Sequence, residues 1–175
     1  MTITTNNLSK VSKPSGLAIK LSDRADAGQT VGFLFEDIEK NAEQLRPLLA
    51  NVAVYDANGI LLLNQTLRKL WDFCRKHIEY KFDPKNQEVL YSPRRVWHQK
   101  FGDCDDQTKF LLCFLFMLKI PFKIRIVGYN KNRGFAHVFP VSWTENGKEI
   151  ILDYVPECQY FGHTPPYLFY KDFHK

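Results

Sequence analysis

The stretch that decides the fold is residues 101–118, FGDCDDQTKFLLCFLFML, in which an acidic cluster leads into an unbroken apolar run. Asp103 is a suitable N-cap, because its carboxylate accepts a hydrogen bond from an unpaired amide in the first turn of a helix. Cys104 then falls at the first helical position. The run from Phe110 to Leu118 is apolar on every side of a helix, which predicts a helix that is covered on all sides. The pattern places Cys104 at the tip of a central buried helix.

Cys104 is the candidate nucleophile of the chain. The positive end of a helix dipole favours the thiolate, which is the attacking form of cysteine. Cys113 lies inside the apolar run, where packing is the expected role. The carboxylates at positions 103, 105 and 106 oppose thiolate formation, so an active Cys104 needs a cationic partner such as a histidine. On residue types alone, a catalytic and a packing role for Cys104 are both open.

Composition limits the class of protein. At 175 residues with 45% hydrophobic residues, the chain predicts one domain with a substantial core. No run approaches the ~18 apolar residues of a membrane span, and residues 1–13 lack the apolar stretch of a signal peptide. Four irregularly spaced cysteines form no zinc pattern, so we expect reduced thiols, a cytoplasmic location, and no metal or cofactor. The net charge of +5 is spread along the chain, which favours a solvated surface over a nucleic-acid site.

Hydrophobic periodicity divides the chain into segments. Residues 1–28 form a polar N-terminal arm, and residues 29–175 form a single domain with a helical part at 29–80, a catalytic core at 81–160 and an aromatic C-terminal tail at 161–175. A first helix is capped by Thr30, Pro47 starts a second short helix, and the clearest amphipathic helix lies within 60–80. An irregular loop spans 81–103.

Three strands are expected after the central helix. Residues 122–127 alternate apolar and basic side chains, which predicts a half-exposed strand; the other strands span 135–143 and 148–155. The tail at 161–175 is expected to pack over this sheet. The predicted fold class is therefore α+β, with a central buried helix carrying the cysteine packed on a small antiparallel sheet.

His137 and Asp153 fall on neighbouring predicted strands. A carboxylate among apolar residues is costly unless it is paired, and a histidine is a suitable partner for Asp153. A loop at 144–146 would place the two directly opposite each other, and a loop at 145–147 would place them diagonally on one face. A two-residue turn at 146–147 would separate them onto opposite faces. Their pairing is allowed by the sequence but not forced.

These residues together resemble a known superfamily. Gly102-Asp-Cys-Asp-Asp, the helix ending at Pro121, His137-Val138 and Leu152-Asp153 are similar to the transglutaminase-like superfamily, which has a papain-like α+β core. The resemblance covers about residues 60–160 and is greatest to short forms from bacteria and Mu-like phages.

The resemblance implies roles for individual residues. Cys104 would be the nucleophile, His137 the base and Asp153 the residue that orients it, with a thioester formed from an amide carbonyl and resolved by water or an amine. The backbone amide of Cys104 and a side-chain donor, Gln99 or Trp97, would hold the oxyanion. A protein or peptide substrate is implied, and hydrolysis by a protease or deamidase is favoured over cross-linking.

Other functions are weighed against this one. A catalytically silent binding or phage assembly protein could retain the same fold, and a phage-encoded chain could be associated with the virion. A basic nucleic-acid-binding domain has no supporting motif, and a metal site is disfavoured because thiolates and carboxylates suit different metals. The substrate and the oligomeric state are not determined by the sequence.

Overall fold

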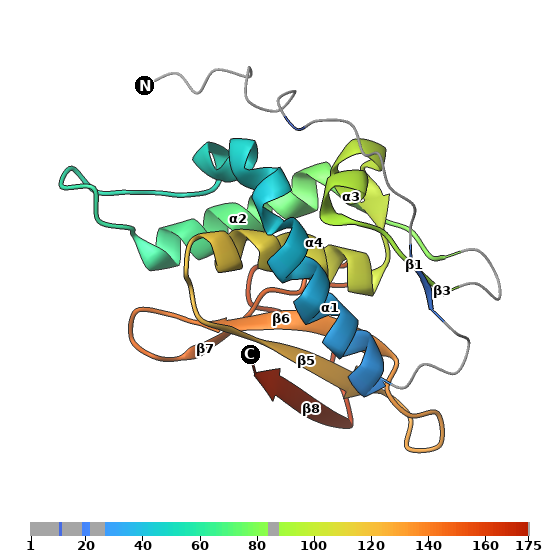
Figure 1. Cartoon of the computed structure of the whole chain (residues 1–175). Coiled ribbons are helices and arrows are strands. Elements are labelled where there is room, and N and C mark those ends of the chain that lie inside the picture. Colours follow the sequence, from blue (N-terminus) through green and yellow to red (C-terminus); the bar gives the residue numbers. More distant parts are fainter. Residues whose placement is uncertain (1–10, 12–18, 22–26, 84–87, 175) are drawn as a thin grey trace.

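The computed structural model describes residues 11, 19–21, 27–83 and 88–174, and Figure 1 shows a helical layer packed on one face of a sheet. The helices are α1 (Ala27–Asn41), the 3-10 helix η2 (Ala42–Asn51), α2 (Leu63–His77), α3 (Pro93–Gln99) and α4 (Cys104–Met117). The sheet is antiparallel with the order β7-β6-β5-β8, formed by β5 (Phe122–Gly128), β6 (His137–Trp143), β7 (Glu149–Ile151) and β8 (Phe169–His174). The α+β class expected from the sequence is confirmed.

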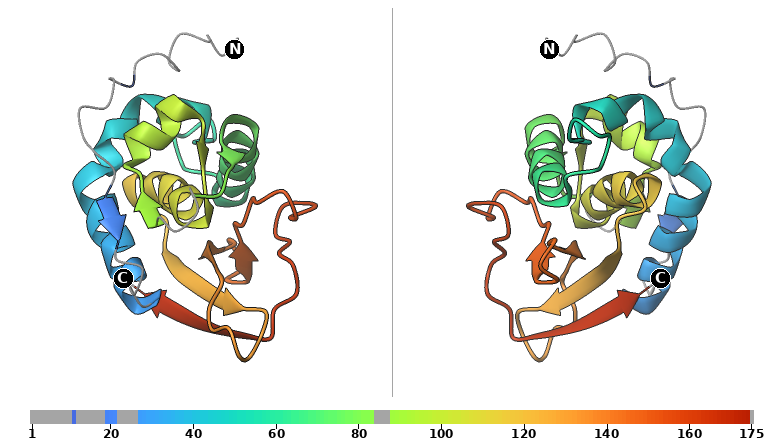
Figure 2. Two further views of the ribbon diagram at one scale, coloured as in Figure 1. Left: turned by 90° about the vertical axis from the view of Figure 1, so that its right-hand side faces the viewer. Right: turned by 90° about the vertical axis from the view of Figure 1, so that its left-hand side faces the viewer.

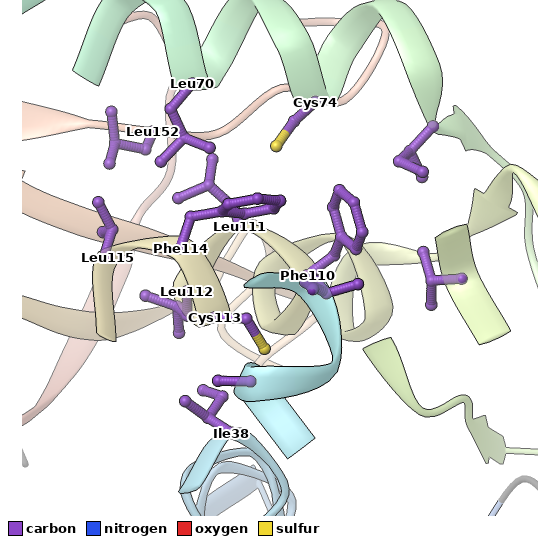
Figure 3. Packing of buried hydrophobic residues seen from close by; sticks show 14 of the residues in the cluster. Ile38, Leu70, Cys74, Phe110, Leu111, Leu112, Cys113, Phe114, Leu115 and Leu152 are labelled. Carbon is purple, nitrogen blue, oxygen red and sulfur yellow. The ribbon is translucent and has the colours of Figure 1, made fainter. Parts of the chain in front are cut away.

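Helix α4 is the centre of the molecule. It packs against all the other helices on one side and against β6 on the other. The two views in Figure 2 show α4 enclosed between the other helices and the sheet. Figure 3 shows Phe110 and Phe114 on the side of α4 that faces Cys74 of α2, while Cys113 faces Ile38 of α1. Cys74 and Cys113 are both fully buried, which confirms the packing role predicted for Cys113.

The helical part differs from prediction at two points. Helix α1 begins at Ala27 rather than after Thr30. Pro47 lies inside η2 instead of starting a new helix. Proline lacks the N–H that an α-helical hydrogen bond needs, and the tighter 3-10 turn continues the helical path around it. Most of the arm predicted at residues 1–28 lies outside the described residues, but within it β1 (Ile19–Leu21) pairs with β3 (Glu88–Leu90).

The segment at 81–103 is more regular than predicted. It contains β3, α3 and β4 (Phe101–Gly102), and β4 pairs in parallel with β2 (Glu79–Tyr80). Helix α3 starts where the Ser92 hydroxyl accepts a hydrogen bond from the Arg95 N–H at 3.4 Å. Pro93 occupies the first helical position, where its fixed φ favours the helix and its missing N–H costs nothing. This start signal lies within the segment expected to be irregular.

The sheet corrects two further predictions. Strand β5 is not half-exposed, because Lys123 and Arg125 are 5% and 6% exposed. Asp172 of β8 forms ion pairs with both, at 2.7 Å to each, and Glu149 of β7 pairs with them as well. The aromatic tail does not lie over the sheet: residues 169–174 form its edge strand β8. The tail therefore supplies the acid that makes burial of two cations possible.

Candidate active site

The tip of α4 is built by the motif Gly102-Asp-Cys-Asp-Asp. Asp103 caps the helix by accepting hydrogen bonds from the N–H groups of Asp105 and Asp106, at 3.2 and 3.3 Å. Gly102 packs so closely that a Cβ there would lie 2.5 Å from the Asp106 Cβ. These contacts fix the position of Cys104 at the first turn, as predicted for the central helix.

A buried ion cluster anchors this helix tip to the rest of the helical layer. Lys109 is fully buried, with its Nζ 3.1 Å from a carboxylate oxygen of Asp37 and 3.7 Å from one of Asp106. Asp106 also accepts a hydrogen bond from the Tyr91 N–H at 2.8 Å. Asp106 therefore has structural partners in Lys109 and Tyr91. Asp37 of α1 supplies the counter-charge that a buried lysine needs.

His137 and Asp153 meet, as the sequence allowed. His137 Nε2 lies 2.8 Å from Asp153 Oδ2. Trp143 pairs with Glu149, and continuing that register places the two residues diagonally, as predicted for a loop at 145–147. The third strand is shorter than predicted: β7 ends at Ile151, so Asp153 lies in the connection that follows it.

The connection after β7 is held in place by several contacts to Asp153. The Thr164 hydroxyl donates to Asp153 Oδ2 at 3.0 Å, and the Val155 N–H donates to Oδ1 at 3.4 Å. The indole N–H of Trp71 in α2 donates to the Asp153 carbonyl at 2.6 Å. A carboxylate bonded on both oxygens has little freedom to turn, so the imidazole that it holds is also fixed.

Cys104 lies against the strand that carries His137. The Thr108 hydroxyl, one helical turn after Cys104, donates to the Val138 carbonyl at 3.1 Å. The backbone N–H of Val138 acts to lower the pKa of the Cys104 thiol, against the larger effects that raise it. The thiol donates to Asp105 Oδ1, with Sγ and the oxygen 3.7 Å apart. The structure thus joins His137 to Asp153 and places Cys104 beside the residue after His137, but the described hydrogen bond of the thiol goes to Asp105.

The electrostatics of the helix tip favour the protonated thiol. Burial, with added repulsion from Asp105 and Asp103, raises the pKa of Cys104 well above its usual range. Burial and neighbouring aspartates also raise the pKa of Asp103. Burial raises the pKa of Asp106 to about 7, against the opposing charge of Lys109. The predicted opposition between the carboxylates and a thiolate is therefore present, and a proton acceptor is required for reaction.

The two candidate oxyanion donors are engaged elsewhere. The Gln99 amide donates to the Phe101 carbonyl at 2.8 Å and accepts from Arg95 Nε at 3.4 Å. The Trp97 ring is buried and stacks against Phe73 and Phe110, with interplanar angles of 13° and 2°. Gln99 thus has a hydrogen-bonding role and Trp97 a packing role, and their participation at the oxyanion stays a prediction.

A cleft of about 260 Å³ opens beside His137. Its walls include Tyr80, Tyr129 and Glu157, and none of these was singled out from the sequence as a site residue. Tyr80 reaches the site because its strand pairs with Gly102, two residues before the cysteine. No periodic pattern predicts this contact of Tyr80, because parallel pairing of two-residue strands leaves no periodic signal.

The comparisons with known proteins address the fold. No family model matches the chain, and no curated protein matches it. A solved structure of a candidate cysteine protease from Cytophaga hutchinsonii matches with a TM-score of 0.51 and 17% identity, covering 76% of this chain and 44% of that one. A candidate protease from Parabacteroides distasonis matches with a TM-score of 0.54 and 10% identity, covering 74% and 26%. The chain has a protease-like fold and spans less than half the length of these neighbours.

The described residues contain neither a candidate membrane-spanning helix nor a candidate metal site. In the described ranges, no helix has both the length and the apolar character needed to cross a bilayer. Those same residues hold no group of three or more histidine, cysteine or acidic side chains arranged to bind a metal ion.

Proposed function

We propose that this protein is a cysteine hydrolase of the transglutaminase-like type, acting on a peptide, isopeptide or glutamine-type amide. The observation that carries the proposal is the 2.8 Å contact between His137 Nε2 and Asp153 Oδ2. His137 lies on β6, and the carbonyl of the next residue, Val138, accepts a hydrogen bond from Thr108, one helical turn after Cys104. The protease-like fold of the structural neighbours supports it. A cysteine at a helix tip with a carboxylate-bound histidine beside it is the arrangement of an acyl-transferring thiol.

The proposed reaction starts with a proton transfer. Asp153 binds Nε2 of His137, so Nδ1 is the nitrogen that accepts the proton of the Cys104 thiol. The sulfur then attacks the amide carbonyl, and the backbone N–H of Cys104 holds the oxyanion. When the C–N bond breaks, the imidazolium returns its proton to the leaving amine and a thioester remains. Water then attacks the thioester carbonyl and gives a proton to His137. The C–S bond breaks, the carboxylic acid leaves, and His137 returns the proton to the sulfur.

For this reaction, the Cys104 thiol has to leave its hydrogen bond to Asp105 and form one to Nδ1 of His137. Contacts between a nucleophile and its base are often loose until substrate binds, so the geometry of Cys104 is compatible with this step. Asp105 keeps the thiol protonated before then, because two adjacent negative charges at a buried site repel each other.

Hydrolysis is proposed rather than cross-linking because water is the default acceptor. The reduced state of all four cysteines fits the proposed cytoplasmic location.

The test measures alkylation of Cys104 by iodoacetamide as a function of pH, with mass spectrometry of wild type and His137→Ala. Cys74, Cys113 and Cys158 are buried and serve as internal references, whereas Cys104 is partly exposed. We expect Cys104 to react fastest in the wild type and to lose most of that advantage without the imidazole.

His174→Ala is the matched control, because His174 is exposed and lies far from His137 on the sheet. His174 pairs with Lys123 at one end of β5, whereas His137 pairs with Val127 at the other end. This variant should behave as wild type. If His137→Ala and His174→Ala both alkylate at the wild-type rate, the thiol is not activated by His137. A silent binding or assembly protein would then be the better interpretation.

A further inference from the structure

The cleft beside His137 has walls of a particular chemical kind. Three of its lining residues are aromatic, namely Tyr80, Phe82 and Tyr129. The rings of Tyr80 and Phe82 meet edge to face, with centroids 5.1 Å apart and an interplanar angle of 88°. Phe82 is 79% exposed and Tyr129 is 40% exposed, so both present ring surface to solvent. Exposed aromatic faces around one cleft are typical of a surface that binds a ligand.

The charge in this cleft is negative, although the chain as a whole carries +5. Glu157 lines the cleft, and the described lining includes no lysine or arginine. Burial raises the pKa of the Tyr80 hydroxyl, and nearby acidic groups that include Glu157 raise it further. The same causes, burial first and then acidic neighbours that include Asp153, raise the pKa of Tyr129 to about 12. The groups facing both tyrosines are therefore mainly acidic.

Aromatic faces combined with a carboxylate recognise one class of ligand. A cation is attracted to the electron-rich face of each ring and forms an ion pair with the carboxylate. An anionic group would be repelled by Glu157, and an apolar side chain would make no use of it. An ammonium group on a peptide satisfies both features of the cleft.

We propose that this cleft binds a protonated amine of the peptide substrate, held between Glu157 and the rings of Tyr80, Phe82 and Tyr129. The inference rests on the proposed function, because the cleft borders His137 and would place the amine close to the amide under attack. The amine can be the α-amine of a peptide or the side chain of a lysine.

The test is a binding measurement that needs no catalysis. Cys104→Ala protein is titrated by calorimetry with three versions of one peptide: a free α-amine without lysine, an acetylated α-amine with lysine, and an acetylated α-amine without lysine. The first two should bind at least about tenfold more tightly than the third if both amines are accepted, because hydrogen bonds to a charged group are worth about that factor. Tight binding of only one of them identifies the source of the amine.

Variants of the same protein separate the two features of the cleft. Glu157→Gln should weaken binding of the amine-bearing peptides about tenfold and leave the neutral peptide unchanged. Phe82→Leu should weaken the same peptides about two- to fivefold, through loss of one ring face. Glu43→Gln removes an equal charge from η2, where Glu43 pairs with Arg46, and should leave binding unchanged.

Equal binding of the three peptides, or wild-type affinity in Glu157→Gln, would overturn the amine site. Neither result would contradict the proposed role of Cys104 as nucleophile, because alkylation of Cys104 is measured without peptide. A failed alkylation test combined with Glu157-dependent amine binding would instead identify an amine-binding protein without catalysis.

Discussion

Gly102→Ala tests how closely the site depends on packing at the tip of α4. The added Cβ would lie 2.5 Å from the Asp106 Cβ, about 1 Å inside ordinary contact, which begins near 3.4 Å. The Asp106 Cβ is fixed to the helix backbone, so the first turn of α4 has to move rather than a flexible side chain. Overpacking of this kind costs about 1–3 kcal/mol. We therefore expect the free energy of unfolding to fall by that amount.

Gly32→Ala is the matched control for this change. A Cβ at Gly32 meets nothing within 4 Å, and the residue lies in the interior of α1. Alanine in a helix interior is more stable than glycine by about 0.5–1 kcal/mol, so this variant should gain stability. The same chemical change should thus have opposite signs at the two positions.

Urea denaturation followed by far-ultraviolet circular dichroism measures both effects. Equal slopes against urea would show that the changes act on stability rather than on the denatured state. If Gly102→Ala is as stable as wild type to within about 0.5 kcal/mol, the close contact with Asp106 does not constrain the helix tip. A displacement of the first turn of α4 by about 1 Å should also lower any Cys104-dependent activity by about a hundredfold. If the contact between Gly102 and Asp106 contributed only to stability, the activity of the folded protein would not change.

Three further predictions concern the sheet, the core and the second contact to Asp153. The hydrogen bond from Arg125 lowers the pKa of Asp172 from 3.8 to about 2; burial opposes this shift and Lys123 adds to it. The Asp172 carboxylate therefore stabilises the fold above pH 4, and this stabilisation is lost as the pH falls through 2. Asp172→Asn should destabilise by about 2 kcal/mol at pH 7 and by much less at pH 2, measured by urea denaturation at both. Leu112→Ala, at a fully buried position of α4, should cost about 2–5 kcal/mol in the same assay, and a smaller loss would mean that the core collapses around the gap. Thr164→Val removes the hydroxyl donor to Asp153 while keeping the side-chain shape. The variant should slow the alkylation of Cys104 and change the free energy of unfolding by less than about 1.5 kcal/mol. An unchanged alkylation rate would show that Thr164 does not position Asp153.

The central helix could be predicted because its information is local. The cap at Asp103 and the apolar run after Lys109 are contained in one stretch. Helix α4 begins at Cys104, as expected, and ends at Met117, one residue before the end of the apolar run and four before Pro121. Strand β8 could not be predicted in this way. Its partner β5 lies more than forty residues earlier, and Pro165-Pro166 just before it is typical of a loop. The burial of Lys123 and Arg125 depends on β8 and was missed with it.

The site shows the same division between local and distant information. His137 and Asp153 were identified from their own surroundings, but the turn between their strands fitted several registers. The structure selects one, in which the Thr144 N–H donates to the Lys148 carbonyl and the Thr144 hydroxyl accepts from the Lys148 N–H. Thr164 and Tyr80 arrive from segments with no sequence signal of contact to the site. Only the folded topology brings them there.

The hydrogen bond from Trp71 to the Asp153 carbonyl has an optical consequence. The chain has three tryptophans, and they lie in three different surroundings. Trp97 is stacked in the core, and Trp143 lies on the sheet with Lys123 Nζ 5.7 Å from its ring centroid, whereas Trp71 is bonded directly to the backbone of the histidine's partner. Indole emission responds to hydrogen bonding and to nearby charge. In a variant whose one remaining tryptophan is Trp71, the fluorescence emission would therefore report movement of the connection that carries Asp153, without any attached dye.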